Sequence, residues 1–142
     1  MPQSIVNIYV HVIFSTKGRE AMIKPLFEKD IYQRLLHDLI KMEVEVEAIN
    51  GLEEHVHILL KLPSTRSISE VIRWCKGETS HWFNNKLMKD TKYRLYWQDG
   101  YTALSVSEKE VPLVKQYIEN QKVIHESHAF AQEIEILKGK QK

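Results

Sequence analysis

Two histidines separated by one residue are the strongest chemical motif in the sequence. His55 and His57 flank Val56 in an apolar stretch, residues 55–62, that predicts a β-strand. Because side chains alternate along a strand, both imidazoles project from one face while Val56 points into the core. Two imidazoles at this spacing can converge on one metal ion. Taken alone, however, this tripeptide is more often a pair of surface or partly buried histidines.

A tyrosine and a glutamine share one face of a helix predicted over residues 111–124. Tyr117 and Gln121 are four residues apart, so they lie one above the other. A helix laid across the sheet would bring the phenol and the amide oxygen to the two histidines. Each residue also has a simpler interpretation, Tyr117 as a core aromatic and Gln121 as a solvated helix residue.

The remaining patterns predict the elements that position these groups. Alternating or β-branched stretches predict strands at 5–14, 43–48, 55–62 and 95–106, and the dipeptide Asn50-Gly51 predicts a turn. Periodicity and capping residues predict helices at 25–41, 67–87, 111–124 and 130–138. This order is that of an α+β, ferredoxin-like split βαβ fold with an antiparallel sheet and an appended C-terminal helix that carries the tyrosine.

Length and composition predict a single domain spanning residues 1–142. The chain is 43% hydrophobic and 27% charged, with only 5 glycines and 4 prolines, as in an ordinary globular protein. Its apolar runs are too short to span a membrane, and its N-terminus lacks the pattern of a signal peptide. The one cysteine, Cys75, excludes an internal disulfide and a cysteine-rich zinc site. We therefore expect a cytoplasmic protein without a membrane partner.

The net charge of +1 is unevenly distributed along the chain. Residues 61–94 include eight basic and three acidic residues, a net charge of +5, interleaved with tryptophans and tyrosines. Cations beside aromatic rings suit single-stranded nucleic acid, although a solvated helix face with core aromatics gives the same pattern. The cations that we predict to contact DNA are Lys61, Arg66, Arg73 and Lys76.

Taken together and in order, the motifs resemble those of the single-tyrosine HUH transposases of small bacterial insertion sequences and their REP-associated relatives. The resemblance covers residues 9–121 and is carried by YVHVIFSTK at 9–17, EHVHILL at 54–60, WQDGY at 97–101 and YIENQ at 117–121. It implies that Tyr117 is the nucleophile, forming a 5′-phosphotyrosine and a free 3′-OH. It also implies that His55, His57 and Gln121 bind Mg²⁺ or Mn²⁺; zinc is compatible with the ligand types but less expected.

The resemblance further implies a bacterial protein that binds single-stranded or hairpin DNA. It implies a homodimer as well, in which the tyrosine helix of one subunit can serve the histidines of the other. His11 projects from the same face of the first strand as Tyr9 and is either structural or a DNA contact. Three alternatives remain: a non-catalytic single-stranded nucleic-acid-binding domain of this fold, a metal-dependent hydrolase, and a replication or relaxase-type HUH endonuclease.

Overall fold

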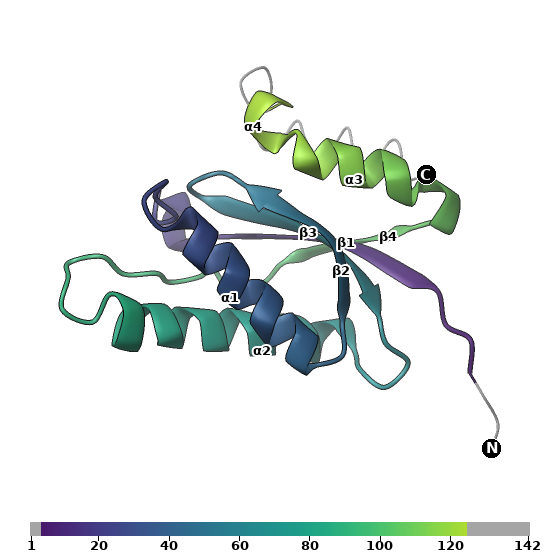
Figure 1. The fold of residues 1–142 in the computed structure, drawn as a ribbon, viewed down its shortest axis with the longest axis horizontal. Helices are drawn as coiled ribbons and strands as arrows, with labels where there is room; N and C mark the ends of the chain where they lie inside the picture. Colours follow the sequence, from purple (N-terminus) through teal and green to yellow (C-terminus); the bar gives the residue numbers. More distant parts are fainter. Residues whose placement is uncertain (1–3, 125–142) are drawn as a thin grey trace.

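The computed structural model describes residues 4–124, which form a four-stranded antiparallel sheet between two helical layers (Figure 1). The strands are β1 (Ile8–Ser15), β2 (Glu45–Gly51), β3 (His55–Leu62) and β4 (Thr102–Val106), in the order β2-β3-β1-β4. The helices are α1 (Glu28–Lys41), α2 (Ile68–Trp82), α3 (Val111–Glu119) and α4 (Gln121–Ile124). The architecture confirms the predicted α+β, ferredoxin-like fold.

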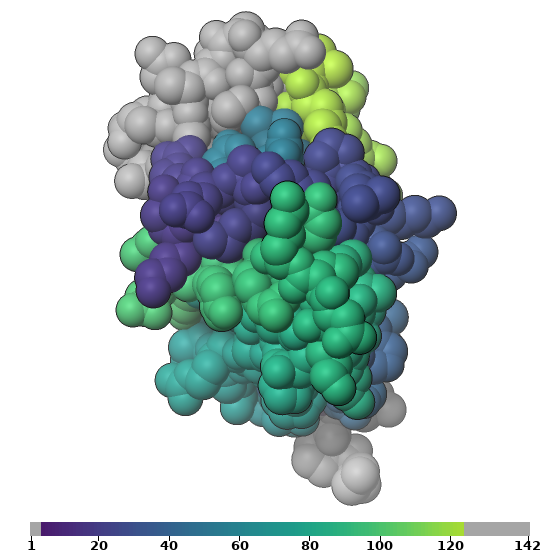
Figure 2. Space-filling model, turned by 90° about the vertical axis from the view of Figure 1, so that its left-hand side faces the viewer, coloured from purple at the N-terminus to yellow at the C-terminus, as the bar shows by residue number. Residues whose placement is uncertain are grey.

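The sheet separates a large apolar core from a smaller layer. Helices α1 and α2 cover one face, and α3 and α4 lie over the other (Figure 1). In the side view, the yellow-green residues of α3 and α4 are at the top, and the teal and green residues of α2 and the following segment are at the bottom (Figure 2). The sheet contributes to the large core Val10, Val12, Phe14, Val56, Ile58 and Leu60. These are the even-numbered residues of β1 and β3, so the odd-numbered residues face α3.

Both helices over the large core pack as their sequences predict, and α2 also begins where its capping residues predict. Ile31, Leu35 and Leu39 of α1 recur at helical spacing and are fully buried. At the start of α2, the Ser67 hydroxyl accepts a hydrogen bond from the Glu70 amide at 3.2 Å, and the Glu70 carboxylate accepts one from the Ser67 amide at 2.7 Å. This reciprocal capping box fixes where α2 begins.

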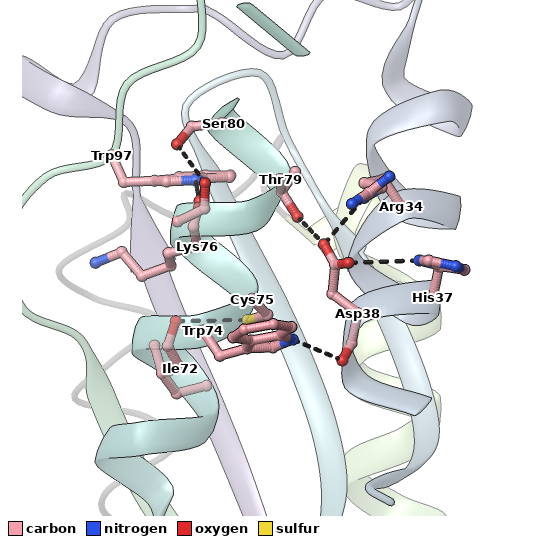
Figure 3. A network of polar contacts seen from close by, with 11 residues as sticks. Arg34, His37, Asp38, Ile72, Trp74, Cys75, Lys76, Thr79, Ser80 and Trp97 are labelled. Carbon is pink, nitrogen blue, oxygen red and sulfur yellow. Dashed lines mark hydrogen bonds and ion pairs between the residues drawn. The ribbon is translucent and has the colours of Figure 1, made fainter. Parts of the chain in front are cut away.

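A buried carboxylate ties α1 to α2 (Figure 3). Asp38 is 1% exposed, and its Oδ2 accepts hydrogen bonds from Arg34 Nε at 3.2 Å and Thr79 Oγ1 at 3.1 Å. Its backbone carbonyl accepts a third from Trp74 Nε1 at 3.2 Å. The pairing of this charge with a guanidinium and a hydroxyl compensates for its burial and sets the two helices in register.

In the N-terminal half, element boundaries differ from the predicted ones. Strand β1 begins at residue 8 rather than 5, α1 at 28 rather than 25, and β2 covers 45–51 rather than 43–48, with irregular pairing between Val46 and Ala48. Asn50 and Gly51 therefore end a strand instead of forming the turn. The backbone at Gly51 packs so closely that a Cβ there would clash with the His55 carbonyl and lie 2.9 Å from Val56 Cα.

In the C-terminal half, three predicted elements are shorter. The helix predicted over 67–87 ends at Trp82 and continues as a π-helical turn (Phe83–Leu87), and the strand predicted from 95 begins at 102. The helix predicted over 111–124 breaks at Asn120, whose φ of −97° and ψ of 16° separate α3 from α4. The helix predicted at 130–138 lies outside the described residues. Among helices within 4–124, none is long and apolar enough to cross a membrane.

Replacing Asp38 with alanine should destabilise the fold by about 2 kcal/mol, because the buried Thr79 hydroxyl and the Arg34 guanidinium lose their acceptor. Urea denaturation followed by circular dichroism measures this change. Asp30→Ala, on the exposed side of the same helix, is the matched control and should cost less than about 1 kcal/mol. Equal midpoints for the two variants would show that the Asp38 network contributes little.

Candidate active site

Three histidines meet on the face of the sheet that α3 covers. His11 comes from β1, and His55 and His57 come from β3; these are the two central strands. All three side chains are fully buried. The ring centroids of His55 and His57 are 5.0 Å apart, and those of His11 and His57 are 5.1 Å apart. The two histidines of β3 thus share a face, as strand alternation predicts.

Each histidine of β3 has a hydrogen-bonding partner at its Nδ1 atom. His55 Nδ1 lies 3.0 Å from Glu54 Oε1, and His57 Nδ1 lies 2.8 Å from His11 Nε2. If both rings donate from Nδ1, each carries its lone pair on Nε2, which is the tautomer of a metal-binding imidazole. A carboxylate and a neighbouring imidazole therefore orient the two rings.

His11 is the residue whose role the sequence left open between structure and DNA contact. The structure places it in the site as the partner of His57. Burial lowers the pKa of His11 to about 4, so its imidazole is neutral at pH 7 and has a nitrogen that can accept the His57 proton. The position of His11 on the same strand face as Tyr9 was the one sequence signal that pointed to this site.

Helix α3 brings Tyr117 to these histidines. Val114 and Ile118, buried on the same helix, pack with Leu59 of β3 and anchor the helix to the sheet. The ring centroid of Tyr117 is 6.0 Å from that of His57 and 6.3 Å from that of His11. A phenol from one helix and imidazoles from two strands thus meet within a single chain.

Gln121 is the first residue of α4 and lies one turn beyond Tyr117. Its side chain is fully buried, and its Nε2 donates to the Tyr117 carbonyl at 3.5 Å. The prediction of one continuous helix carrying both residues was wrong, yet the break at Asn120 keeps them together. Within residues 4–124, the buried Gln121 Oε1 accepts no hydrogen bond. A buried acceptor without a donor suits a cation, so the set His55, His57 and Gln121 fits a divalent metal ion.

The candidate ligand set depends on the amide oxygen of Gln121 as the third donor. Among the described residues, no group of three or more histidine, cysteine, aspartate or glutamate side chains is arranged to hold a metal ion. Two imidazoles and one amide oxygen are a neutral donor set, which leaves the charge of a metal available to a phosphate.

The four cations predicted to bind DNA come from different elements, and only Arg73 and Lys76 line one hollow. Lys61, at the end of β3 on the α3 side, has its Nζ 5.9 Å from the centroid of the Tyr9 ring. Arg66 is exposed in the segment between β3 and α2, and Arg73 is exposed on α2, in the layer on the other face of the sheet.

Lys76 has a structural role that the sequence did not indicate. Its Nζ donates to the carbonyls of Gln98 and Gly100, both at 2.9 Å, and burial lowers its pKa. It thereby ties α2 to the segment that leads into β4. Lys76 also lines a hollow of about 310 Å³, together with Arg73 and Tyr101.

Comparisons with known proteins give one family and a shared fold. Residues 4–121 match the family described as "Transposase IS200 like". A solved structure of a candidate transposase from Deinococcus radiodurans R1 has 22% identity and a TM-score of 0.65, covering 85% of this chain and 95% of that one. A REP-associated tyrosine transposase bound to a REP hairpin has 22% identity and a TM-score of 0.61, covering 88% and 72%. No curated protein matches the chain.

The geometry predicts that His11→Leu weakens Mn²⁺ binding by roughly 10- to 100-fold, because His57 loses the group that orients it. Isothermal titration of the purified protein with Mn²⁺ measures the affinity, and circular dichroism checks the fold. His57→Ala should abolish binding, whereas His81→Ala, an exposed histidine on α2, should leave it unchanged. Equal Mn²⁺ affinity in the His11→Leu and wild-type proteins would contradict an orienting role for His11.

Proposed function

This chain belongs to the IS200-like transposase family, and from that premise we propose that it cleaves and rejoins single-stranded DNA through a covalent bond between Tyr117 and a 5′ phosphate. The observation that carries the proposal is the Tyr117 ring, 6.0 Å from the His57 ring inside a buried group of imidazoles. A tyrosine beside a potential metal site has the parts needed for nucleophilic attack on a phosphodiester.

The proposed reaction has two steps, cleavage and rejoining. The Tyr117 oxygen attacks phosphorus and gives up its proton; the bond from phosphorus to the 3′ oxygen breaks, and that oxygen takes up a proton. The products are a 5′-phosphotyrosine and a free 3′-OH. A 3′-OH then attacks the phosphotyrosine and releases the phenol, so the strand is rejoined without ATP.

The divalent metal belongs to the proposal, since Mg²⁺ or Mn²⁺ fits the donor set of His55, His57 and Gln121. When bound, it would polarise the scissile phosphate and stabilise the departing oxygen. The protein's own part is orientation: Glu54 orients His55 at 3.0 Å, and His11 orients His57 at 2.8 Å. A free phenol has a pKa near 10 and is a weak nucleophile, so its position beside the polarised phosphate is essential.

The proposed partner is single-stranded or hairpin DNA. One protein of similar fold is bound to a REP hairpin, and residues 61–94 of this chain have a net charge of +5. The proposed phosphate contacts are Lys61, Arg66, Arg73 and Lys76. Lys76 also holds the carbonyls of Gln98 and Gly100.

Tyr117→Phe should fold, bind Mn²⁺ and bind DNA, yet form no covalent adduct and no cleaved product, because only the attacking oxygen is lost. A denaturing gel of protein incubated with labelled single-stranded oligonucleotides and Mn²⁺ shows both species. Tyr9→Phe is the matched control, because Tyr9 packs in the same small cluster under α3; it should remain active.

The same gel separates the alternatives. Cleavage by Tyr117→Phe without an adduct would indicate water as the nucleophile, and DNA binding by the wild-type protein without any cleavage would indicate a non-catalytic binding domain. Either result would overturn the proposed mechanism.

The tyrosine and the histidines are proposed to act within one chain, because Tyr117 packs beside its own His57. A mixture of Tyr117→Phe and His57→Ala proteins should therefore form no adduct, whether or not the protein is the proposed homodimer. The denaturing gel measures this outcome, and each variant mixed with wild-type protein serves as the control. An adduct formed only on mixing would show that the site is shared between subunits.

A further inference from the structure

The break between α3 and α4 is held by two polar side chains. Asn50, near the end of β2, donates from Nδ2 to the carbonyls of Ile118 and Glu119, both at 3.1 Å. Its Oδ1 accepts a hydrogen bond from Lys122 Nζ at 2.9 Å. We call Asn50 and Lys122 the latch. It lies at the edge of the sheet, because β2 is an edge strand.

The side chain of Asn50 supplies hydrogen-bond donors to carbonyls at the C-terminal end of α3. The last carbonyls of an α-helix lack the i+4 amide that the helix interior supplies, and the carbonyls of Ile118 and Glu119 are two of them. A side-chain amide offers two N–H donors and one acceptor oxygen, and Asn50 uses all of these groups here. The sheet therefore adds to the cap of α3, in which the Asn120 amide also donates to the carbonyls of Gln116 and Ile118.

The latch is joined directly to the strand that carries the histidines. Asn50 is the cross-strand partner of His57 in the β2–β3 ladder, so both side chains project from the same face. The carbonyl of Gly51 accepts a second hydrogen bond from Lys122 Nζ at 2.6 Å. A movement of the α3–α4 break away from His57 would have to break these bonds.

Lys122 extends the latch around the sheet edge to the opposite layer. Its Nζ lies 3.2 Å from Glu28 Oε1 of α1 and 5.9 Å from the centroid of the Tyr32 ring. The lysine side chain is 47% exposed, so the ion pair is a weak contribution compared with its two hydrogen bonds to β2.

We infer that Asn50 and Lys122 are positioning residues, which hold Tyr117 and Gln121 at a fixed distance from His57 for the attack; this inference rests on the proposed function. A continuous helix would fix the two residues relative to each other, but Asn120 interrupts it. Asn50 fixes the carbonyls just after Tyr117, and Lys122 directly follows Gln121. The latch thus controls both sides of the break.

Three variants separate the parts of the latch. Asn50→Ala removes every side-chain hydrogen bond of residue 50. Asn50→Asp keeps an acceptor for Lys122 and replaces the N–H donor to the two carbonyls with a second acceptor oxygen. Lys122→Met keeps the length of the side chain and removes the ammonium. The matched controls are Asn85→Ala, which removes an amide bonded to the His81 carbonyl at 3.0 Å, and Lys29→Met, which removes an exposed ammonium from α1.

The test measures the rate of covalent adduct formation against DNA concentration. Asn50→Ala and Asn50→Asp should lower the maximal rate by roughly 10- to 100-fold, the range found when an orienting partner is removed. The DNA concentration at half-maximal rate should stay within about threefold of the wild-type value, because the latch contacts no proposed DNA-binding residue. Lys122→Met should lower the maximal rate by a smaller factor, and both controls should match the wild-type protein.

Hydrogen exchange of the same proteins gives a second readout. Amides of residues 117–123 should exchange faster in Asn50→Ala and Asn50→Asp, while those of β1 and β3 stay protected. An active wild-type protein together with latch variants of equal maximal rate would overturn the inference alone. A wild-type protein that forms no adduct would overturn the proposed function and the inference with it. Loss of DNA affinity rather than rate would also overturn the inference.

Discussion

The alternation of side chains along β1 and β3 is the constraint on which the candidate site depends. These central strands pair over eight residue pairs, from Ile8 with Leu62 to Ser15 with His55. Their even-numbered residues fill the core, and their odd-numbered residues include the three histidines. A slip by one residue would put imidazoles in the core and apolar side chains under α3. The large core on one face therefore fixes the site on the other.

Burial of polar groups is the second condition of the arrangement. Burying three imidazoles and an amide would destabilise the fold if these groups lacked hydrogen-bonding partners. Glu54 and His11 supply hydrogen bonds to the two histidines of β3, and the amide of Gln121 donates to the backbone of α3. Groups held in this way need little reorganisation when a charge develops beside them, which is the property that makes buried polar sites effective in catalysis.

Features that depend on local periodicity could be predicted from the sequence. The strand at 55–62 and the shared face of His55 and His57 needed only the alternation of residue types, and the start of α2 near residue 67 needed only local capping residues. Tertiary contacts set the rest. Asn50 favours a turn locally, but its amide binds the carbonyls of α3 and it remains in a strand. The sequence does not distinguish Lys76 from other basic residues on a helix, because its partners, the carbonyls of Gln98 and Gly100, are brought to it only by the tertiary fold.

The two layers of the protein differ in how firmly they are held. On the sheet face that carries the histidines, the described residues form a cluster of five buried hydrophobic side chains: Ala48, Leu59, Val106, Val114 and Ile118. The core under α1 and α2 is far larger. Because less apolar surface is buried on this face, detaching α3 should cost less than global unfolding, even with the hydrogen bonds of Asn50 and Lys122 to break. A local opening of this kind would expose the phenol and imidazoles to a strand too bulky to enter a closed site, while the register of β1 and β3 stays intact.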